Sequence, residues 1–215
     1  MIGPNGAGKT TLFNGISGLH PLTSGRVLFD GEDVTPLKAH EVARRGLART
    51  FQVYVASGDL NVKENVMVGG FMHNRSRSAA EAGAQEILEN LHLAELSDAL
   101  VSELPVAAQK RVTMATALAS KPKLLLLDEV AAGLNPQEIE EIMSHIRHIH
   151  EDLGVTVMLI EHVMELVMNV SHRVLVLDYG EKIADGTPET IVGDERVIKA
   201  YLGERFLKTR EKENS

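Results

Sequence analysis

A phosphate-binding pattern lies at residues 3–10, which read Gly-Pro-Asn-Gly-Ala-Gly-Lys-Thr and match G-x-x-x-x-G-K-[ST] in full. Glycine lets the backbone turn tightly and aim successive N–H groups at phosphate oxygens. Lys9 is expected to reach the β- and γ-phosphates of a nucleotide, and the Thr10 hydroxyl to bind Mg²⁺. A glycine-rich turn before an ordinary helix is the alternative, and the full match disfavours it. The expected nucleotide contacts are consecutive: Gly3, Pro4, Asn5, Gly6, Ala7, Gly8, Lys9, Thr10 and Thr11.

Two carboxylates end an unbroken leucine run later in the chain. Leu124–Leu127 is typical of a strand covered on both faces, and Asp128 and Glu129 follow it directly. Asp128 is expected to steady Mg²⁺ through its water shell, and Glu129 to polarise the attacking water. Alone, the run could be a core strand with a solvated end. Together with the glycine-rich pattern it indicates a nucleoside triphosphatase.

The composition is that of a soluble globular chain. It has 215 residues, 44% hydrophobic and 24% charged, which favours one domain or one domain with a small inserted lobe. The longest apolar runs, among them Leu124–Leu127 and Val157–Ile160, are too short to cross a bilayer. The chain has no cysteine, which suits the cytosol, and its net charge of −8 argues against a nucleic-acid partner.

Hydrophobic spacing and turn residues predict alternating strands and helices that would position these motifs. The predicted strands are 26–29, 47–51, 124–127, 155–160, 173–178 and 181–184. One predicted helix follows the glycine-rich pattern, and the others cover 36–45, 79–100 and 137–153. Strands alternate with helices from Leu124 to Leu177, which predicts an α/β fold with a parallel sheet and crossover helices.

Three further segments resemble the ATP-binding cassette family of transporter ATPases. Arg49–Gln52 is similar to the segment that ends in the family's Q-loop glutamine, Ala132–Pro136 to the D-loop, and Ile160–His162 to the switch histidine after a strand. The resemblance implies that Gln52 contacts Mg²⁺ and the attacking water, and that His162 contacts the γ-phosphate. The implied catalytic residues are Glu129, His162 and Gln52, and the implied metal ligands are Thr10, Gln52 and Asp128.

The same resemblance implies a fold and a division into parts. The fold would be a P-loop nucleoside triphosphatase, with a RecA-like parallel sheet core and an inserted helical subdomain. The core is expected at residues 1–70 and 104–203, the helical subdomain at 71–103, and a charged tail at 204–215.

Several segments narrow the resemblance to import ATPases for branched-chain amino acids. They include Glu64–Gly69, Asp178–Gly180 and Val197–Glu204. The resemblance implies ATP and Mg²⁺ as ligands, membrane permease subunits as partners, and a second ATP-binding subunit in a homo- or heterodimer. It places the chain in the cytoplasm, peripheral at the inner face of the plasma membrane through the permease. Other solutes stay open, because this kind of subunit never touches the solute.

The family's signature segment is altered in this chain. It falls at Leu104–Ala108, where Ala107 stands for the expected glycine and Ala108 for the expected glutamine. The resemblance implies that Pro105, Ala107 and Gln109 face the γ-phosphate bound by the opposite subunit of a dimer. Each hydrogen bond lost there costs about 1.5–3 kcal/mol if its partner is charged. The alternative function is therefore a catalytically weak or inactive partner subunit that assembles with a competent ATPase.

Only Met1 and Ile2 precede Gly3, too few residues for the strand that should lead into a phosphate-binding loop. The aromatic residue that stacks on adenine in the family is also missing, so we expect an N-terminally shortened member. A DNA-repair ATPase with a similar head is disfavoured, because about one hundred residues separate Lys9 from Gln109 and leave no room for a long coiled coil.

Three histidines in the predicted helix 137–153 suggest a metal site at first sight. His145 and His148 are neighbours on a helix surface, but His150 points nearly opposite to His148. We therefore expect two solvated histidines and one near the core.

Overall fold

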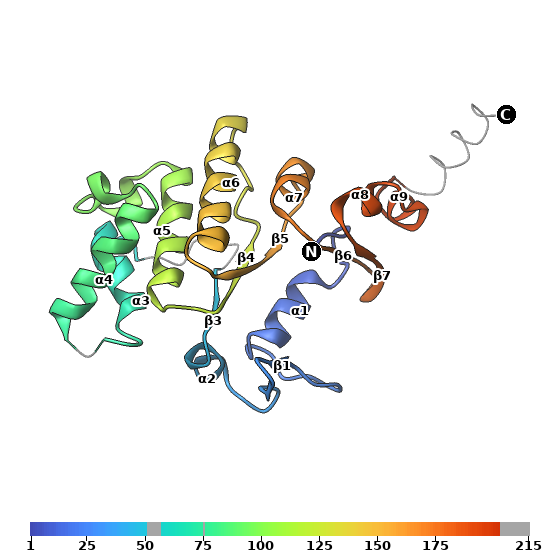
Figure 1. Ribbon diagram of the computed structural model, residues 1–215, viewed down its shortest axis with the longest axis horizontal. Helices are drawn as coiled ribbons and strands as arrows, with labels where there is room; N and C mark the ends of the chain where they lie inside the picture. The colour runs from blue at the N-terminus through green and yellow to red at the C-terminus, as the bar shows by residue number, and fades with distance from the viewer. Residues whose placement is uncertain (51–56, 75, 203–215) are drawn as a thin grey trace.

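The computed structural model of the chain describes residues 1–50, 57–74 and 76–202. The described part is elongated, with a group of helices at one end, a strand hairpin with two helices at the other, and a parallel sheet between them (Figure 1). The strands are β1 (Leu28–Phe29), β2 (Glu32–Asp33), β3 (Leu47–Arg49), β4 (Leu124–Asp128), β5 (Thr156–Ile160), β6 (Val174–Asp178) and β7 (Glu181–Gly186). The helices are α1 (Lys9–Ile16), α2 (Ala39–Arg44), α3 (Val62–Gly70), α4 (Arg77–Asn90), α5 (Val106–Ala119), α6 (Pro136–Glu151), α7 (Met164–Val170), α8 (Pro188–Val192) and α9 (Glu195–Leu202), with 3₁₀ turns η1 (Ala94–Leu96) and η2 (Val101–Glu103).

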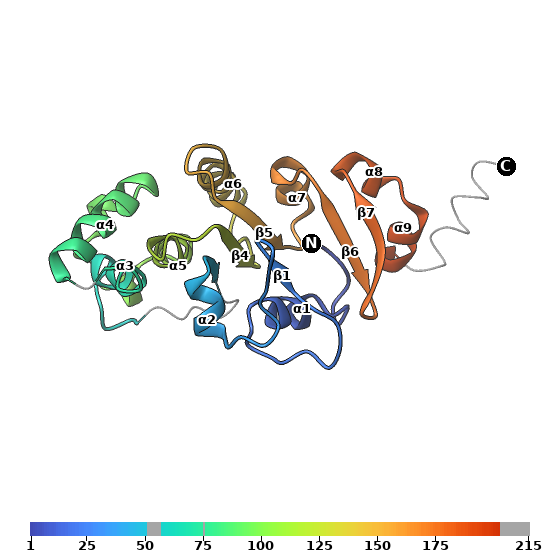
Figure 2. The same cartoon turned by 60° about the horizontal axis from the view of Figure 1, so that its bottom comes forward.

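Strand β4 is the centre of the parallel sheet. It pairs with β3 on one side and with β5 on the other, so that Asp128 lies opposite Ile160. Leu126 packs in a cluster with Phe13 of α1, whereas Leu125 and Leu127 belong to the larger cluster with the apolar stripe of α6. The predicted strand is thus confirmed as buried on both faces, with α1 and α6 on opposite sides of the sheet (Figure 2).

Met1 and Ile2 lie between β5 and the antiparallel β6–β7 hairpin. Ile2 forms a parallel bridge with Val176, donates from its N–H to Leu175 O, and accepts at its carbonyl from Leu177 N. The carbonyl of Met1 accepts from Glu161 N. The sequence indicated too few residues for a strand here, and Ile2 makes only an isolated bridge. However, Met1 and Ile2 still form backbone hydrogen bonds to the chain on both sides, because β5 and β6 each have one edge without a neighbouring strand among the described residues.

Two predicted helices are shorter in the structure. The helix expected at 36–45 begins only at Ala39, because Pro36 lies in a turn that Leu37 N closes on Val34 O. The helix expected at 79–100 covers only Arg77–Asn90. His92, with φ 52°, takes the left-handed conformation that ends helices, and Leu93 N then donates back to Leu88 O.

Helices α3, α4 and α5 pack against one another and form the group at one end of the molecule (Figure 1). Helix α3 starts with a capping box, in which Asn61 Oδ1 accepts from Glu64 N and Glu64 Oε2 accepts from Asn61 N. Helix α3 packs with this group although it ends before residue 71, where the helical subdomain was expected to begin. The boundaries at residues 71 and 103 stay predictions.

Candidate nucleotide-binding site

The loop at residues 3–8 takes a conformation that requires glycine. Gly6 and Gly8 have φ values of 79° and 95°, and a Cβ on Gly3 would lie 2.2 Å from Leu177 O. Gly8 occupies the position just before α1, so the loop leads directly into the helix N-terminus. Backbone N–H groups at a helix N-terminus, together with the helix dipole, favour a bound phosphate.

A cleft of about 670 Å³ opens over this loop. It brings together residues of the loop, of the start of α1 and of the ends of β4 and β5: Asn5, Gly6, Ala7, Gly8, Lys9, Thr10, Thr11, Glu129 and His162. Gly3 and Pro4 lie at the base of the loop, where their carbonyls accept from Lys9 Nζ at 2.8 and 3.0 Å. These predicted residues therefore converge on one cleft.

Lys9 is almost fully buried although it is charged. Burial lowers its pKa, and the carboxylates of Glu129 and Asp128 act in the opposite direction. The loop carbonyls of Gly3 and Pro4 accept from its ammonium group, which is therefore held inside the phosphate-binding loop.

Glu129 and His162 form the polar pair of the cleft. Oε1 of Glu129 lies 2.9 Å from Nε2 of His162. The pair exists because β4 and β5 are parallel neighbours, and Glu129 N continues their ladder by donating to Ile160 O. Glu129 has φ 52°, a left-handed conformation that is strained for a residue with a side chain. A carboxylate and an imidazole in contact can accept a proton from water and donate to a phosphate.

Glu161 supports this pair through backbone contacts, although no sequence motif pointed to a role for it. Its side chain is 1% exposed; Oε1 accepts from Ala131 N at 2.9 Å, and Oε2 accepts from His162 N. Burial raises the pKa of Glu161, against these hydrogen bonds and the charge of Lys110. The only sequence signal for Glu161 was the presence of an acidic residue between a predicted strand and His162. Through its two hydrogen bonds, Glu161 connects the loop after Glu129 to His162.

Asp128 has one oxygen that suits a metal site. Its Oδ2 accepts from Arg49 at 2.8 Å, whereas its buried Oδ1 has no hydrogen-bond partner among the described residues. Thr10 adds an exposed hydroxyl at the start of α1. Hydroxyl and carboxylate oxygens are the ligands that Mg²⁺ prefers, so this donor set fits the ion. Gln52, the third predicted ligand and a predicted catalytic residue, lies outside the described residues.

The signature residues are not brought into this cleft. Pro105 precedes α5, Ala107 is buried, and Gln109 donates from Nε2 to Leu104 O at 2.9 Å. None of these residues lines the cleft of the same chain. Their expected contact is with a second subunit, and it stays a prediction.

Comparisons with known proteins agree with this geometry. The sequence pattern of the ABC transporter family matches residues 1–132, and that of the branched-chain amino acid ATP-binding cassette transporter matches residues 181–206. The chain is 39% identical to the high-affinity branched-chain amino acid transport ATP-binding protein BraF of Pseudomonas aeruginosa, over 95% of this chain and 86% of the relative. It is 37% identical, with the same coverage, to the high-affinity branched-chain amino acid transport ATP-binding protein LivG of Escherichia coli.

A solved structure extends the likeness to three dimensions. The crystal structure of the ADP conformation of an ATP-binding cassette of an ABC transporter matches with a TM-score of 0.84 and 31% identity, covering 94% of this chain and 86% of that one. Sequence and fold thus agree over nearly the whole chain. The protein belongs to the ABC transporter family and has the P-loop ATPase fold of its ATP-binding cassettes.

Proposed function

We propose that this chain is the ATP-hydrolysing subunit of an importer for branched-chain amino acids or similar solutes. The observation that carries the proposal is the Glu129–His162 pair, which faces the phosphate-binding loop across one cleft. The names of BraF and LivG and the match over residues 181–206 support the solute class.

The proposed mechanism follows from the positions of the side chains. Backbone N–H groups of the loop and Lys9 bind the phosphates, and Glu129 accepts a proton from the attacking water. His162 donates to the γ-phosphate and orients Glu129 through their shared hydrogen bond. Thr10, Asp128 and Gln52 are the residues that would hold Mg²⁺, and the ion would supply positive charge to the phosphates.

The proposed partners are membrane permease subunits and a second ATP-binding subunit, in a homo- or heterodimer. Among the described residues, no helix is long and apolar enough to span a bilayer. In this proposal the chain reaches the inner face of the plasma membrane through its permease. In the dimer, the segment with Pro105, Ala107 and Gln109 would face the nucleotide of the other subunit.

ATP hydrolysis by purified protein tests the assigned base. Substituting Glu129→Gln should lower turnover by about 10²–10⁴-fold, the usual contribution of a general base, while ATP binding is retained. Glu140→Gln changes an exposed carboxylate on α6 and should leave both properties unchanged. Turnover that is equal in the Glu129→Gln variant and the parent would refute the assigned role.

The altered signature segment favours a second candidate, a weak or inactive partner of a competent ATPase. Ala107 is buried and carries a Cβ where the family has glycine. In that case the chain alone would show no turnover, and turnover would appear only after mixing with a competent ATP-binding subunit. The substitution Glu129→Gln in this chain would then leave the turnover of the mixture unchanged.

A further inference from the structure

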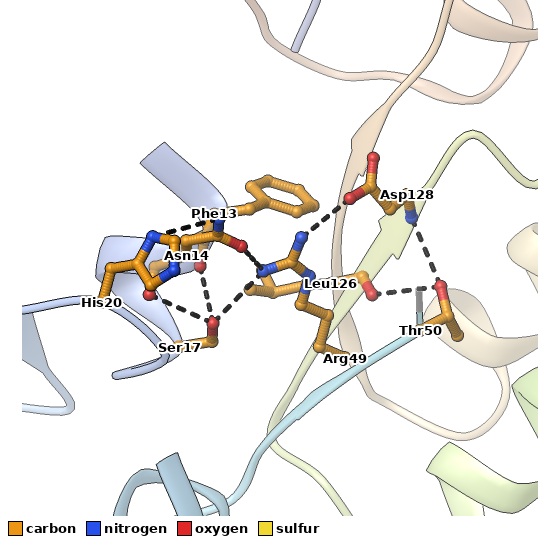
Figure 3. Close-up of polar contacts among 8 residues, drawn as sticks. All are labelled: Phe13, Asn14, Ser17, His20, Arg49, Thr50, Leu126 and Asp128. Atoms are coloured by element: carbon orange, nitrogen blue, oxygen red, sulfur yellow. Dashed lines mark hydrogen bonds and ion pairs between the residues drawn. The ribbon is translucent and has the colours of Figure 1, made fainter. Parts of the chain in front are cut away.

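Arg49 makes a buried ion pair at the edge of the proposed magnesium site. It is the last residue of β3, and its NH2 group donates to Asp128 Oδ2 at 2.8 Å. The side chains of Arg49 and Asp128 are 6% and 2% exposed. Figure 3 shows the guanidinium between Asp128 and the side chains of α1. The pair therefore joins two parallel strands at their carboxyl ends, and Asp128 directly precedes Glu129, which lines the cleft.

The same guanidinium also holds helix α1. Its NH1 group donates to Asn14 Oδ1 at 2.6 Å and to Ser17 Oγ at 3.4 Å, and the group lies 5.5 Å from the centre of the Phe13 ring (Figure 3). Helix α1 begins at Lys9, directly after the phosphate-binding loop. One side chain thus links the strand that leads to Gln52, the helix behind the loop and the carboxylate of Asp128.

The orientation of Asp128 is determined from two sides. Arg49 binds its Oδ2, and the backbone N–H of Asp128 donates to Thr50 Oγ1 at 3.3 Å. The opposite oxygen, Oδ1, is buried without a hydrogen-bond partner among the described residues. A contact that served stability alone would not need this arrangement, because a buried ion pair is often no more stable than apolar residues of similar size.

We propose that Arg49 is a positioning residue for the magnesium–nucleotide site. It holds Oδ2 of Asp128, so that Oδ1 is left for the metal and its water shell, and it ties this carboxylate to α1 behind the phosphate-binding loop. The inference rests on the proposed ATP-binding function and adds a residue to it. Partners that orient a metal ligand usually change metal affinity by about 10–100-fold when they are replaced.

The test measures binding of a non-hydrolysable ATP analogue by calorimetry, with Mg²⁺ and with EDTA. Arg49→Lys keeps a cation beside Asp128 but loses the planar fork that reaches Asn14 and Ser17 at the same time. The affinity gained from Mg²⁺ should fall by about tenfold, while the affinity in EDTA is unchanged. A purely structural role would instead lower both affinities together, and that result would overturn the proposal.

Two further variants make the test decisive. Arg45 directly follows helix α2 and forms an exposed ion pair with Glu32. The substitution Arg45→Lys alters this ion pair and should change neither affinity. Asn14→Ala keeps the Arg49–Asp128 pair and removes one anchor on α1, so it should give a smaller loss of the Mg²⁺ effect. If Arg49→Lys does not fold, an Asn14→Ala variant with the full Mg²⁺ effect overturns the proposal. If the parent protein itself gains no affinity from Mg²⁺, the proposed function fails, whatever the variants do.

Discussion

At the scale of single residues, the cleft depends on groups that do not line it. Glu161 accepts hydrogen bonds from the backbone N–H groups of Ala131 and His162. Lys110 Nζ donates to the carbonyl of Glu129 at 3.0 Å. These contacts determine where the two strand ends place their functional side chains. Because Glu129 adopts a left-handed conformation that ordinary residues avoid, the contacts must also outweigh local strain.

Glu161 gives a pH-dependence with a definite sign. Burial raises its pKa above the ordinary value of 4.5, so the folded state binds this proton more tightly than the unfolded state. The contribution to stability is present below pH 4.5 and is lost as pH rises through the raised pKa. Glu161→Gln removes this dependence, so the difference in unfolding free energy, variant minus parent, should increase between pH 4.5 and 8 in urea titrations. Glu165→Gln, an exposed control on α7, should give a flat difference. A flat difference for Glu161→Gln would contradict the raised pKa.

At the scale of elements, α3 and α5 approach closely at Gly69. A Cβ on Gly69 would lie 1.9 Å from Thr116 O and 3.3 Å from the Cβ of Ala119. Gly69 belongs to a segment that marked the family resemblance, and this contact supplies a physical reason for glycine there. The helical group therefore depends on backbone-to-backbone packing as well as on its apolar side chains.

The close approach predicts opposite effects for the same substitution at two helix positions. Gly69→Ala should destabilise the protein by about 1–3 kcal/mol, because the helices must separate to admit the methyl group. Gly83→Ala on α4 meets only Asn74 Nδ2 at 3.9 Å and should stabilise by up to about 1 kcal/mol through helix propensity. Chemical unfolding of both variants measures the contrast. Stabilisation by Gly69→Ala would show that the two helices do not pack this closely.

At the scale of the whole molecule, the helical group meets the core through His92 and His145. Their rings are 5.6 Å apart, with His92 after α4 and His145 on α6. His145 is 6% exposed, as the sequence predicted for one of the three histidines. His148 instead pairs with Asp152, and His150 lies near Val155 O. No group of three His, Cys, Asp or Glu residues in the described part is arranged to hold a metal.

Protonation of His145 should weaken this contact. Burial, followed by the charges of Arg111, His92 and His148, lowers its pKa from 6.5 to about 4. The unfolded state therefore binds the proton more tightly, and stability falls as pH drops from 6.5 towards 4, by about 3 kcal/mol for this group. His145→Phe keeps a ring against His92 and should lose less stability than the parent over this range in urea titrations. The exposed control His40→Phe should retain the parental pH-dependence, and equal pH-dependence in all three proteins would refute the assignment.

The sequence by itself determined the motifs whose residues are consecutive. The phosphate-binding loop, the leucine strand with its two acids, the stripe of α6 and the β6–β7 hairpin all follow from local spacing, and the structure contains each of them. The family resemblance, and not spacing alone, further implied that the residues after β4 and β5 take part in catalysis. Local patterns suffice here because each element buries its own apolar face, and residues at strand ends must share one edge of a parallel sheet.

Only the tertiary structure decided which groups support the cleft. Arg49 and Asp128 are far apart in the chain, as are Glu161 and Ala131, and their pairing depends on strand order and on side-chain direction. Likewise, α4 ends at Asn90 because His92 adopts a left-handed conformation. The hydrophobic periodicity of Ala79–Leu100 does not predict this end. Contacts between distant segments depend on the position of every intervening element, and no short stretch of sequence encodes that position.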